Sequence, residues 1–153
     1  FNWLGWPLVV MGDGPEKKRL ESAALPNISF LGHVSDEQRK GLMSRAKAVV
    51  VVALEDYGLV PIEANVSGTP VVAYGAGGVL DTQVPEKTGV FFHRQSPEAL
   101  YHAMLKASAI QWDHRQIREH VLKSFTEDVF FEKVMTLIED AYGRHLAAGS
   151  SPA

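Results

Sequence analysis

Short apolar runs alternate with amphipathic segments along most of the chain. The predicted strands are residues 7–11, 28–32, 48–53, 70–74 and 89–92. Most of these runs are apolar without a two-residue alternation, which is typical of parallel strands that are covered on both faces. The pattern predicts an α/β fold with an open, doubly wound parallel sheet and right-handed crossovers. We expect the strands at 48–53 and 70–74 to be buried on both faces.

The intervals between the strands carry signals for the start of a helix. Ser35 and Gln38 form a capping box before an amphipathic segment. Ser96 is a predicted N-cap, because Pro97 follows it at the first helical position. The stretch "GDGP" at residues 12–15 lacks the spacing of a phosphate-binding glycine loop, so we interpret it as a tight turn that starts a helix at Pro15.

A longer amphipathic helix is predicted near the end of the chain, over residues 127–146, with Thr126 as its cap. Its apolar stripe consists of Phe130, Val134, Leu137, Ile138 and Ala141. We expect residues 1–147 to form one domain and the small, polar segment 148–153 to be a disordered tail.

Composition narrows the class of protein. The 153 residues are 46% hydrophobic and 22% charged, which is typical of a soluble globular domain that is long enough to bury a hydrophobic core. A net charge of −3 gives no basic field, so we expect no nucleic-acid partner. There is no cysteine, and no apolar run approaches the ~20 residues that span a membrane. The six histidines have no metal-ligand spacing, so no metal site is expected.

Ligands of doubly wound sheets bind beyond the carboxyl ends of the strands, against helix N-termini. The turns at those ends are residues 12–15, 32–35, 55–58 and 75–78. Three of the four contain two residues or fewer with bulky side chains, which lets the backbone approach a ligand closely. His33 lies in the second of these turns, Gly32-His33-Val34, where it is either a binding residue or, more commonly, a surface histidine near a helix cap.

The turn at residues 55–58 leads into the helix with the clearest chemistry. Gly58 is a predicted N-cap for a helix that ends near Ser67, with Pro61 in the first turn. The N–H groups of Leu59 and Val60 then have no partner within the helix. A diphosphate is a natural anion for this position, because those donors and the helix dipole both stabilise it.

Two glutamates flank this helix start. Glu63 sits about one turn into the helix and leans back toward its N-terminus, so its carboxylate could bind the hydroxyls of a ribose. Glu55, at the end of the strand, could bind a second polyol. In "GAGG", Gly77 and Gly78 could offer N–H groups to a sugar or phosphate. The alternative for Glu63 is a solvated helix face, and the alternative for Glu55 is a polar turn. For Gly77 and Gly78 the alternative is a flexible glycine loop.

Four segments together resemble one protein family. They are "LVVMGDGPEKKRLE", "NISFLGHVSDEQ", "AKAVVVVALEDYGLVPIEANVSGTPVVAYGAGGVLDT" and "KTGVFFHRQSPEAL". The chain resembles the C-terminal half of group 1 retaining glycosyltransferases of the GT-B fold, over roughly residues 7–142. The most specific element is the pair Glu55 and Glu63 in the spacing E-x7-E, and the variant is most similar to bacterial mannosyltransferase-like members.

The resemblance implies a Rossmann-like donor-binding domain and a role for each site residue. Glu55 would be the catalytic residue and would contact the hydroxyls of the donor sugar, and Glu63 would hold the ribose. The backbone at Gly58 and Leu59, beside Tyr57, would meet the diphosphate. The remaining implied contacts are the turn Gly32-His33-Val34, which would frame the base, and the glycines Gly77 and Gly78.

The resemblance also implies partners and a reaction. The donor would be GDP-mannose or a UDP-sugar, and a hexose such as mannose would pass to a glycan or lipid acceptor without a cofactor or metal. An N-terminal acceptor domain and the Arg and Lys that grip the diphosphate would lie upstream of Phe1. The whole protein would be cytoplasmic, with peripheral association at the inner face of the membrane.

The sequence departs from the family pattern at two places. Ala53-Leu54 replaces a polar pair before the motif, and Asp81 stands where glutamate is common after the glycines. Two alternatives to the enzyme remain. One is a non-catalytic nucleotide-sugar-binding module. The other is a receiver-like or flavodoxin-like domain, which the lack of an aspartate cluster or flavin loop after the first strand disfavours.

Overall fold

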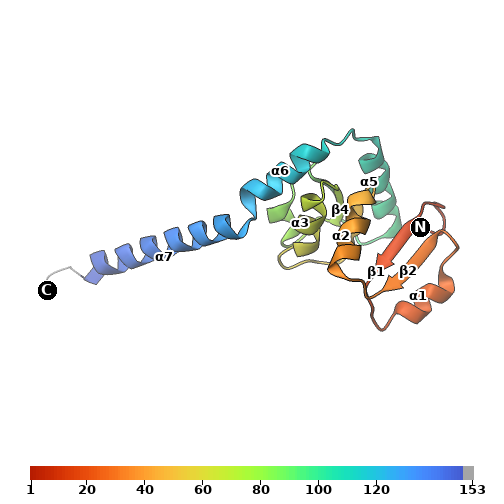
Figure 1. Cartoon of the computed structure of the whole chain (residues 1–153), viewed down its shortest axis with the longest axis horizontal. Helices are drawn as coiled ribbons and strands as arrows, with labels where there is room; N and C mark the ends of the chain where they lie inside the picture. The colour runs from red at the N-terminus through yellow and green to blue at the C-terminus, as the bar shows by residue number, and fades with distance from the viewer. Residues whose placement is uncertain (150–153) are drawn as a thin grey trace. The chain divides into compact units, whose positions relative to one another are not determined.

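The computed structural model describes residues 1–149 of the chain (Figure 1). In chain order the elements are β1 (Leu8–Met11), α1 (Lys17–Ala23), β2 (Ile28–Gly32), α2 (Asp36–Arg45), β3 (Val49–Val51), α3 (Leu59–Val66), β4 (Val71–Tyr74), α4 (Val79–Thr82), β5 (Gly89–Phe92), α5 (Pro97–Ala109), α6 (His114–Ser124) and α7 (Glu127–Gly149). Each predicted strand is present, in places shortened by a residue or more. The chain divides into two compact units, Phe1–Arg45 and Ala46–Ala153.

The first unit is built on a parallel pair of strands. β1 pairs with β2 in the register Leu8↔Ile28, with an irregularity between Val10 and Met11. Asn27 helps to hold the entry to β2, because its side-chain amide donates to the carbonyls of Phe1 and Trp6 at 3.1 and 2.8 Å. Both strands therefore end at the same edge, where their turns carry Gly12 and Gly32.

The second unit contains a parallel sheet of three strands in the order β3-β4-β5. Val49 pairs with Val71, and Val71 pairs with Gly89 on its other side. α3 connects β3 to β4, and the short α4 lies in the connection from β4 to β5 (Figure 1). The predicted α/β class with parallel strands is confirmed.

The core of this unit covers both faces of β4. On one face, Val71 and Ala73 cluster with Ala64 of α3 and with Val79. On the other face, Val72 clusters with residues of β5 and α5, and the full set is Val72, Val90, Phe92, Ala103 and Ala107. β4 is thus buried on both faces, as predicted.

β3 does not meet the same expectation. Val49 and Val50 are only half-buried, and Val52 beyond the strand is 52% exposed. β3 is an outer strand of this sheet, so only one of its edges is paired. An outer position alone does not account for this difference, because β5 is also an outer strand and is mostly buried.

Most predicted helix starts are confirmed. The Ser35 N–H donates to Gln38 Oε1 at 3.0 Å, and the Gln38 N–H donates to Ser35 Oγ at 3.2 Å, so the capping box is complete. Ser96 accepts from the Ala99 N–H at 3.2 Å, with a proline in the first turn. The prediction for α1 was early by two residues, because the helix begins at Lys17 rather than at Pro15.

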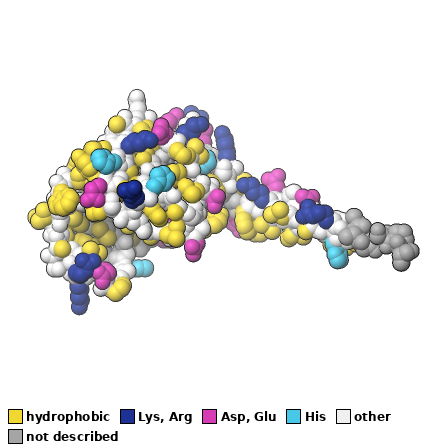
Figure 2. Space-filling view, turned by 180° about the vertical axis from the view of Figure 1, so that it is seen from behind, with side chains coloured by type: hydrophobic (Ala, Val, Ile, Leu, Met, Phe, Trp, Pro, Cys, Tyr) yellow, Lys and Arg dark blue, Asp and Glu magenta, His cyan; other side chains and the backbone are white. Residues whose placement is uncertain are grey.

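α7 follows Thr126, whose hydroxyl accepts from the Val129 N–H at 3.3 Å. Exposed apolar side chains run along the helix, as Figure 2 shows, and they include Phe130, Phe131, Met135, Leu137, Ile138, Tyr142 and Leu146. α7 extends to Gly149, and the rest of the predicted tail lies outside the described residues. Within residues 1–149, no helix is both long enough and apolar enough to span a membrane.

Candidate functional site

The helix start predicted between the two glutamates is present. Gly58 is the N-cap of α3 and has a left-handed backbone, with φ 87° and ψ 43°. Pro61 is buried in the first turn, where its missing N–H removes no helical hydrogen bond. Leu59, at the first helical position, is 60% exposed. The first N–H groups of α3 therefore lie at an exposed helix start, where such donors have no partner within the helix.

The loop before α3 is joined to the glycine loop after β4. Glu55 forms an isolated parallel bridge with Gly77, and the Gly78 N–H donates to the Glu55 carbonyl at 2.8 Å. A Cβ at Gly77 would lie 2.4 Å from the Glu55 carbonyl oxygen. The backbone of Glu55 is thus fixed by a segment more than 20 residues later in the chain, and the Glu55 side chain is half-buried.

The same close packing continues at the start of the helix. A Cβ at Gly78 would lie 2.4 Å from the Tyr57 carbonyl carbon, and a Cβ at Gly58 would lie 3.0 Å from Thr82 Oγ1. Gly58, Gly78 and Thr82 are buried, whereas the Tyr57 side chain is 57% exposed. The glycines let the two loops touch, and the Gly78 N–H is engaged by Glu55 rather than presented to solvent.

Glu63 lies in α3, where its side chain is half-buried. The helix that carries it is anchored by Asn65, which is 0% exposed. The Asn65 amide donates to the carbonyls of Thr69 and Thr88 at 2.9 and 3.2 Å. These hydrogen bonds fix the C-terminal end of α3 against the strands, and so fix the direction in which its N-terminus points.

Two histidines, for which the sequence predicted only that they bind no metal, support these elements from α6. His114 Nδ1 donates to the Gly68 carbonyl at 2.9 Å, and His120 Nε2 donates to the Thr82 carbonyl at 3.3 Å. α6 packs against α3, and its residue Ile117 is 0% exposed. The only sequence signal was that both histidines lie on one helix, and that signal does not reveal their carbonyl partners.

The predicted base-framing turn lies in the first unit. Gly32 is buried with φ 64°, and its carbonyl accepts from the Gly12 N–H at 2.7 Å. Lys17 Nζ lies 3.1 Å from Asp13 Oδ2. The hydrogen bond from Lys17 lowers the pKa of Asp13, helped by the Gly14 N–H and by the charge of His33. His33 is exposed, so its ring is accessible.

The structure therefore divides the predicted site residues between its two units. Gly32, His33 and Val34 lie in the first unit, and Glu55, Tyr57, Gly58, Leu59, Glu63, Gly77 and Gly78 lie in the second. Within the second unit, direct contacts bring the Glu55 loop, the start of α3 and the glycine loop together. Among residues 1–149, no group of three or more His, Cys, Asp or Glu side chains could hold a metal ion.

Comparison with known proteins places this arrangement in a family. The family model "Glycosyl transferases group 1" matches residues 4–123. An uncharacterised glycosyltransferase of Methanocaldococcus jannaschii is 27% identical over 129 residues, which are 80% of this chain and 32% of that protein. A GDP-mannose-dependent alpha-mannosyltransferase of Mycobacterium tuberculosis is 35% identical over 101 residues, which are 62% of this chain and 26% of that protein.

Solved structures agree with the fold. Sucrose-phosphate synthase from Thermosynechococcus elongatus is 27% identical, with a TM-score of 0.69, over 92% of this chain and 38% of that one. Anabaena HepE in complex with UDP-glucose is 21% identical, with a TM-score of 0.66, over 88% of this chain and 41% of that one. The chain thus spans well under half the length of these proteins.

Proposed function

Because the chain belongs to the group 1 glycosyl transferases, we propose that it is the donor-binding domain of a retaining enzyme. The donor is a nucleoside-diphosphate sugar, GDP-mannose or a UDP-sugar, and the transferred group is a hexose. The names of two similar proteins support this range, since one is a GDP-mannose-dependent mannosyltransferase and another binds UDP-glucose. The acceptor is a glycan or a lipid, held by a further domain of the whole protein.

The observation that carries the proposal is the exposed start of α3 between two half-buried glutamates. The first-turn N–H groups and the helix dipole stabilise an anion such as a diphosphate. Glu63, one turn further, is placed to accept hydrogen bonds from the ribose hydroxyls. Glu55, at the other side of the turn, is placed to accept hydrogen bonds from the donor sugar.

The fixed backbone around Glu55 suits this division of roles. The Gly78 N–H donates to the Glu55 carbonyl at 2.8 Å, and the backbone of Gly77 lies close against the same carbonyl. A carboxylate on a fixed backbone loses little conformational freedom when it binds a sugar, which favours affinity. The exposed Tyr57 lies between Glu55 and the helix start, beside the proposed diphosphate position.

The test compares nucleotide binding by matched variants of the chain. Glu63→Ala should weaken the binding of GDP or UDP roughly tenfold to a hundredfold, because a charge-assisted hydrogen bond contributes ~1.5–3 kcal/mol. Glu55→Ala should leave nucleotide affinity nearly unchanged, because its proposed partner is the sugar. Glu139→Ala, at an exposed position of α7, is the control. Isothermal titration calorimetry measures the affinities of the wild type and the three variants for GDP and for UDP.

A measurement of sugar transfer by the whole protein distinguishes an enzyme from a non-catalytic binding module. In the whole protein, Glu55→Ala should lower transfer from the intact donor far more than Glu139→Ala does. Equal losses of nucleotide affinity in Glu55→Ala and Glu63→Ala would contradict the assigned roles. Nucleotide binding without transfer by the whole protein, across a panel of glycan and lipid acceptors, would favour a non-catalytic binding module.

A further inference from the structure

The short helix α4 packs against the start of α3, and contacts with other elements hold both of its ends. α4 has four residues, Val79–Thr82, and a helix of that length has little stability of its own. At its N-terminal end, the Gly78 N–H donates to the Glu55 carbonyl at 2.8 Å. At its C-terminal end, His120 Nε2 of α6 donates to the Thr82 carbonyl at 3.3 Å. The position of α4 therefore depends on the Glu55 loop and on α6.

A continuous series of hydrogen bonds crosses α4 from His120 to Glu55. The Thr82 N–H donates to the Gly78 carbonyl at 3.2 Å, and the Gly78 N–H donates to the Glu55 carbonyl. The Thr82 side chain also lies against the helix start, because a Cβ at Gly58 would come within 3.0 Å of Thr82 Oγ1. Thr82, Gly58 and Gly78 are all buried. A shift of Thr82 would therefore move both the backbone of Glu55 and the N-cap of α3.

The His120 ring is itself held in a fixed position. Ile117 and Val121 of α6 are 0% and 2% exposed, and His120 lies on the same side of the helix, since residues three and four apart are neighbours. The Phe125 ring lies edge-on to the His120 ring, with the ring centroids 5.7 Å apart. A carbonyl oxygen only accepts, so His120 Nε2 carries the proton of this hydrogen bond. His120 thus offers a fixed donor to α4.

The Thr82 carbonyl accepts from a second donor as well. Gln83 Nε2 donates to it at 3.2 Å, and a carbonyl oxygen can accept two hydrogen bonds. Gln83 directly follows Thr82, so this hydrogen bond cannot fix α4 relative to a distant element. Of the two donors, only His120 belongs to another helix. Loss of the His120 side chain should therefore loosen the end of α4 without abolishing it.

We propose that His120 is a positioning residue for the donor site. It holds the C-terminal end of α4, and through Thr82 and Gly78 it fixes the Glu55 backbone and the start of α3. His120 acts through these residues and needs no contact with the donor. A preorganised site binds more tightly, because less conformational freedom is lost on binding. The effect on the donor rests on the proposed function, whereas the series of hydrogen bonds from His120 to Glu55 does not.

The first test is amide hydrogen exchange, followed by NMR, in the chain without a ligand. In His120→Ala, the Gly78 and Thr82 amides should exchange at least about threefold faster than in wild type, a factor that corresponds to about 0.7 kcal/mol. The amides of β4, which report on global unfolding, should change less. His120→Gln should restore most of the protection, because its side-chain amide can donate to the same carbonyl. Unchanged exchange at Gly78, or equal acceleration at Gly78 and in β4, would overturn the proposal.

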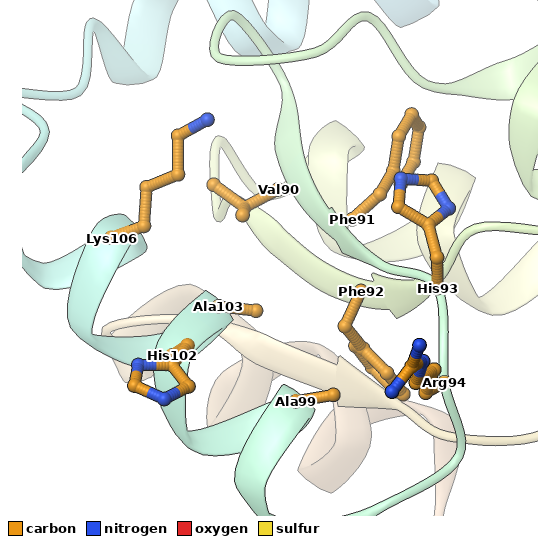
Figure 3. A pocket seen from close by; sticks show the side chains of 9 residues that line it. All are labelled: Val90, Phe91, Phe92, His93, Arg94, Ala99, His102, Ala103 and Lys106. Atoms are coloured by element: carbon orange, nitrogen blue, oxygen red, sulfur yellow. The ribbon is translucent and has the colours of Figure 1, made fainter.

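Two control variants separate positioning from a general loss of stability. Ser96→Ala removes the hydroxyl that caps α5 and destabilises the chain without touching this series of hydrogen bonds. His102→Ala makes the same substitution at an exposed histidine. Figure 3 shows that the His102 side chain extends from α5, which carries no residue of the series. Both variants should keep the wild-type ratio of Gly78 exchange to β4 exchange, and a change of that ratio in Ser96→Ala as large as in His120→Ala would contradict the assignment.

Nucleotide affinity tests the role of His120 at the donor site. In isothermal titration calorimetry with GDP and UDP, His120→Ala should bind at least about threefold more weakly than wild type, and His120→Gln and both controls should bind nearly as wild type does. Equal affinities of wild type and His120→Ala would overturn this role.

Glu63→Ala distinguishes that failure from a failure of the proposed function. If wild type bound neither nucleotide, or if Glu63→Ala bound as tightly as wild type, the proposed function would be wrong at this site. The exchange measurements would still decide whether His120 fixes the Glu55 backbone, because they need no nucleotide.

Discussion

The contact between the glycine loop and the Glu55 loop can be tested by adding a single methyl group. In Gly78→Ala, the new Cβ would lie 2.4 Å from the Tyr57 carbonyl carbon and 2.5 Å from the Asp56 carbonyl oxygen, where ordinary contacts begin at 3.4 Å. The two loops must separate by about 1 Å, because these neighbours are backbone atoms that cannot rotate away.

The expected cost follows from this overlap. Overpacking of a well-packed site costs ~1–3 kcal/mol, and separation of the loops also strains the hydrogen bond from the Gly78 N–H to Glu55. For a chain of this size, ~2 kcal/mol lowers the midpoint of thermal unfolding by roughly 4–8 °C. Circular dichroism of wild type and variant measures this difference.

Gly143→Ala is the matched control for the same substitution. A Cβ at Gly143 meets nothing within 4 Å, and the residue lies inside α7. Alanine is the better helix former by ~1 kcal/mol, so this variant should unfold at the wild-type temperature or above it. If Gly78→Ala and Gly143→Ala unfolded at the same midpoint temperature, the close approach of the two loops would be wrong.

Two further predictions concern the helices that flank the sheet. Ser96→Ala should lower the free energy of unfolding by ~1 kcal/mol in urea titrations, because Ser96 caps α5 through the Ala99 N–H, whereas Ser108→Ala on the exposed side of α5 should not lower it. Ile117→Ala should lower that free energy by ~2–5 kcal/mol, because this α6 side chain is 0% exposed. Leu122→Ala, where the side chain is 47% exposed, should have a much smaller effect, and equal effects of the two would refute the packing of α6.

Local signals predicted the elements around the site well. Gly58 and Pro61 fix the start of α3 through backbone geometry alone, and the observed helix Leu59–Val66 ends one residue before the predicted Ser67. The capping pair Ser35 and Gln38 depends on neighbouring residues in the same way. Such predictions succeed because the interactions that decide them lie within one turn of the chain.

Contacts between distant segments were not predictable in the same way. The glycines at 77 and 78 signalled a close approach, but the approaching group is the backbone of Glu55 and Tyr57 rather than only a ligand. The hydrogen bond from His120 to Thr82 joins residues 38 apart in sequence. The apolar run at 48–53 overestimated β3, because hydrophobicity does not show where the chain leaves the sheet.

The parallel order of β3, β4 and β5 has a consequence for how the second unit folds. Parallel strands cannot be joined by a tight hairpin. Two such strands can therefore pair only after the crossover segment between them has been made. Val49 pairs with Val71, and Val71 pairs with Gly89, so each strand pairs with the next strand in sequence, but only after the chain between them has crossed back along the sheet. Non-local pairing slows folding, because loop-closure entropy is lost before the contacts form. During synthesis, α3 can therefore form before β4 has left the ribosome, and α6, which packs against α3, is made only after β5 and α5.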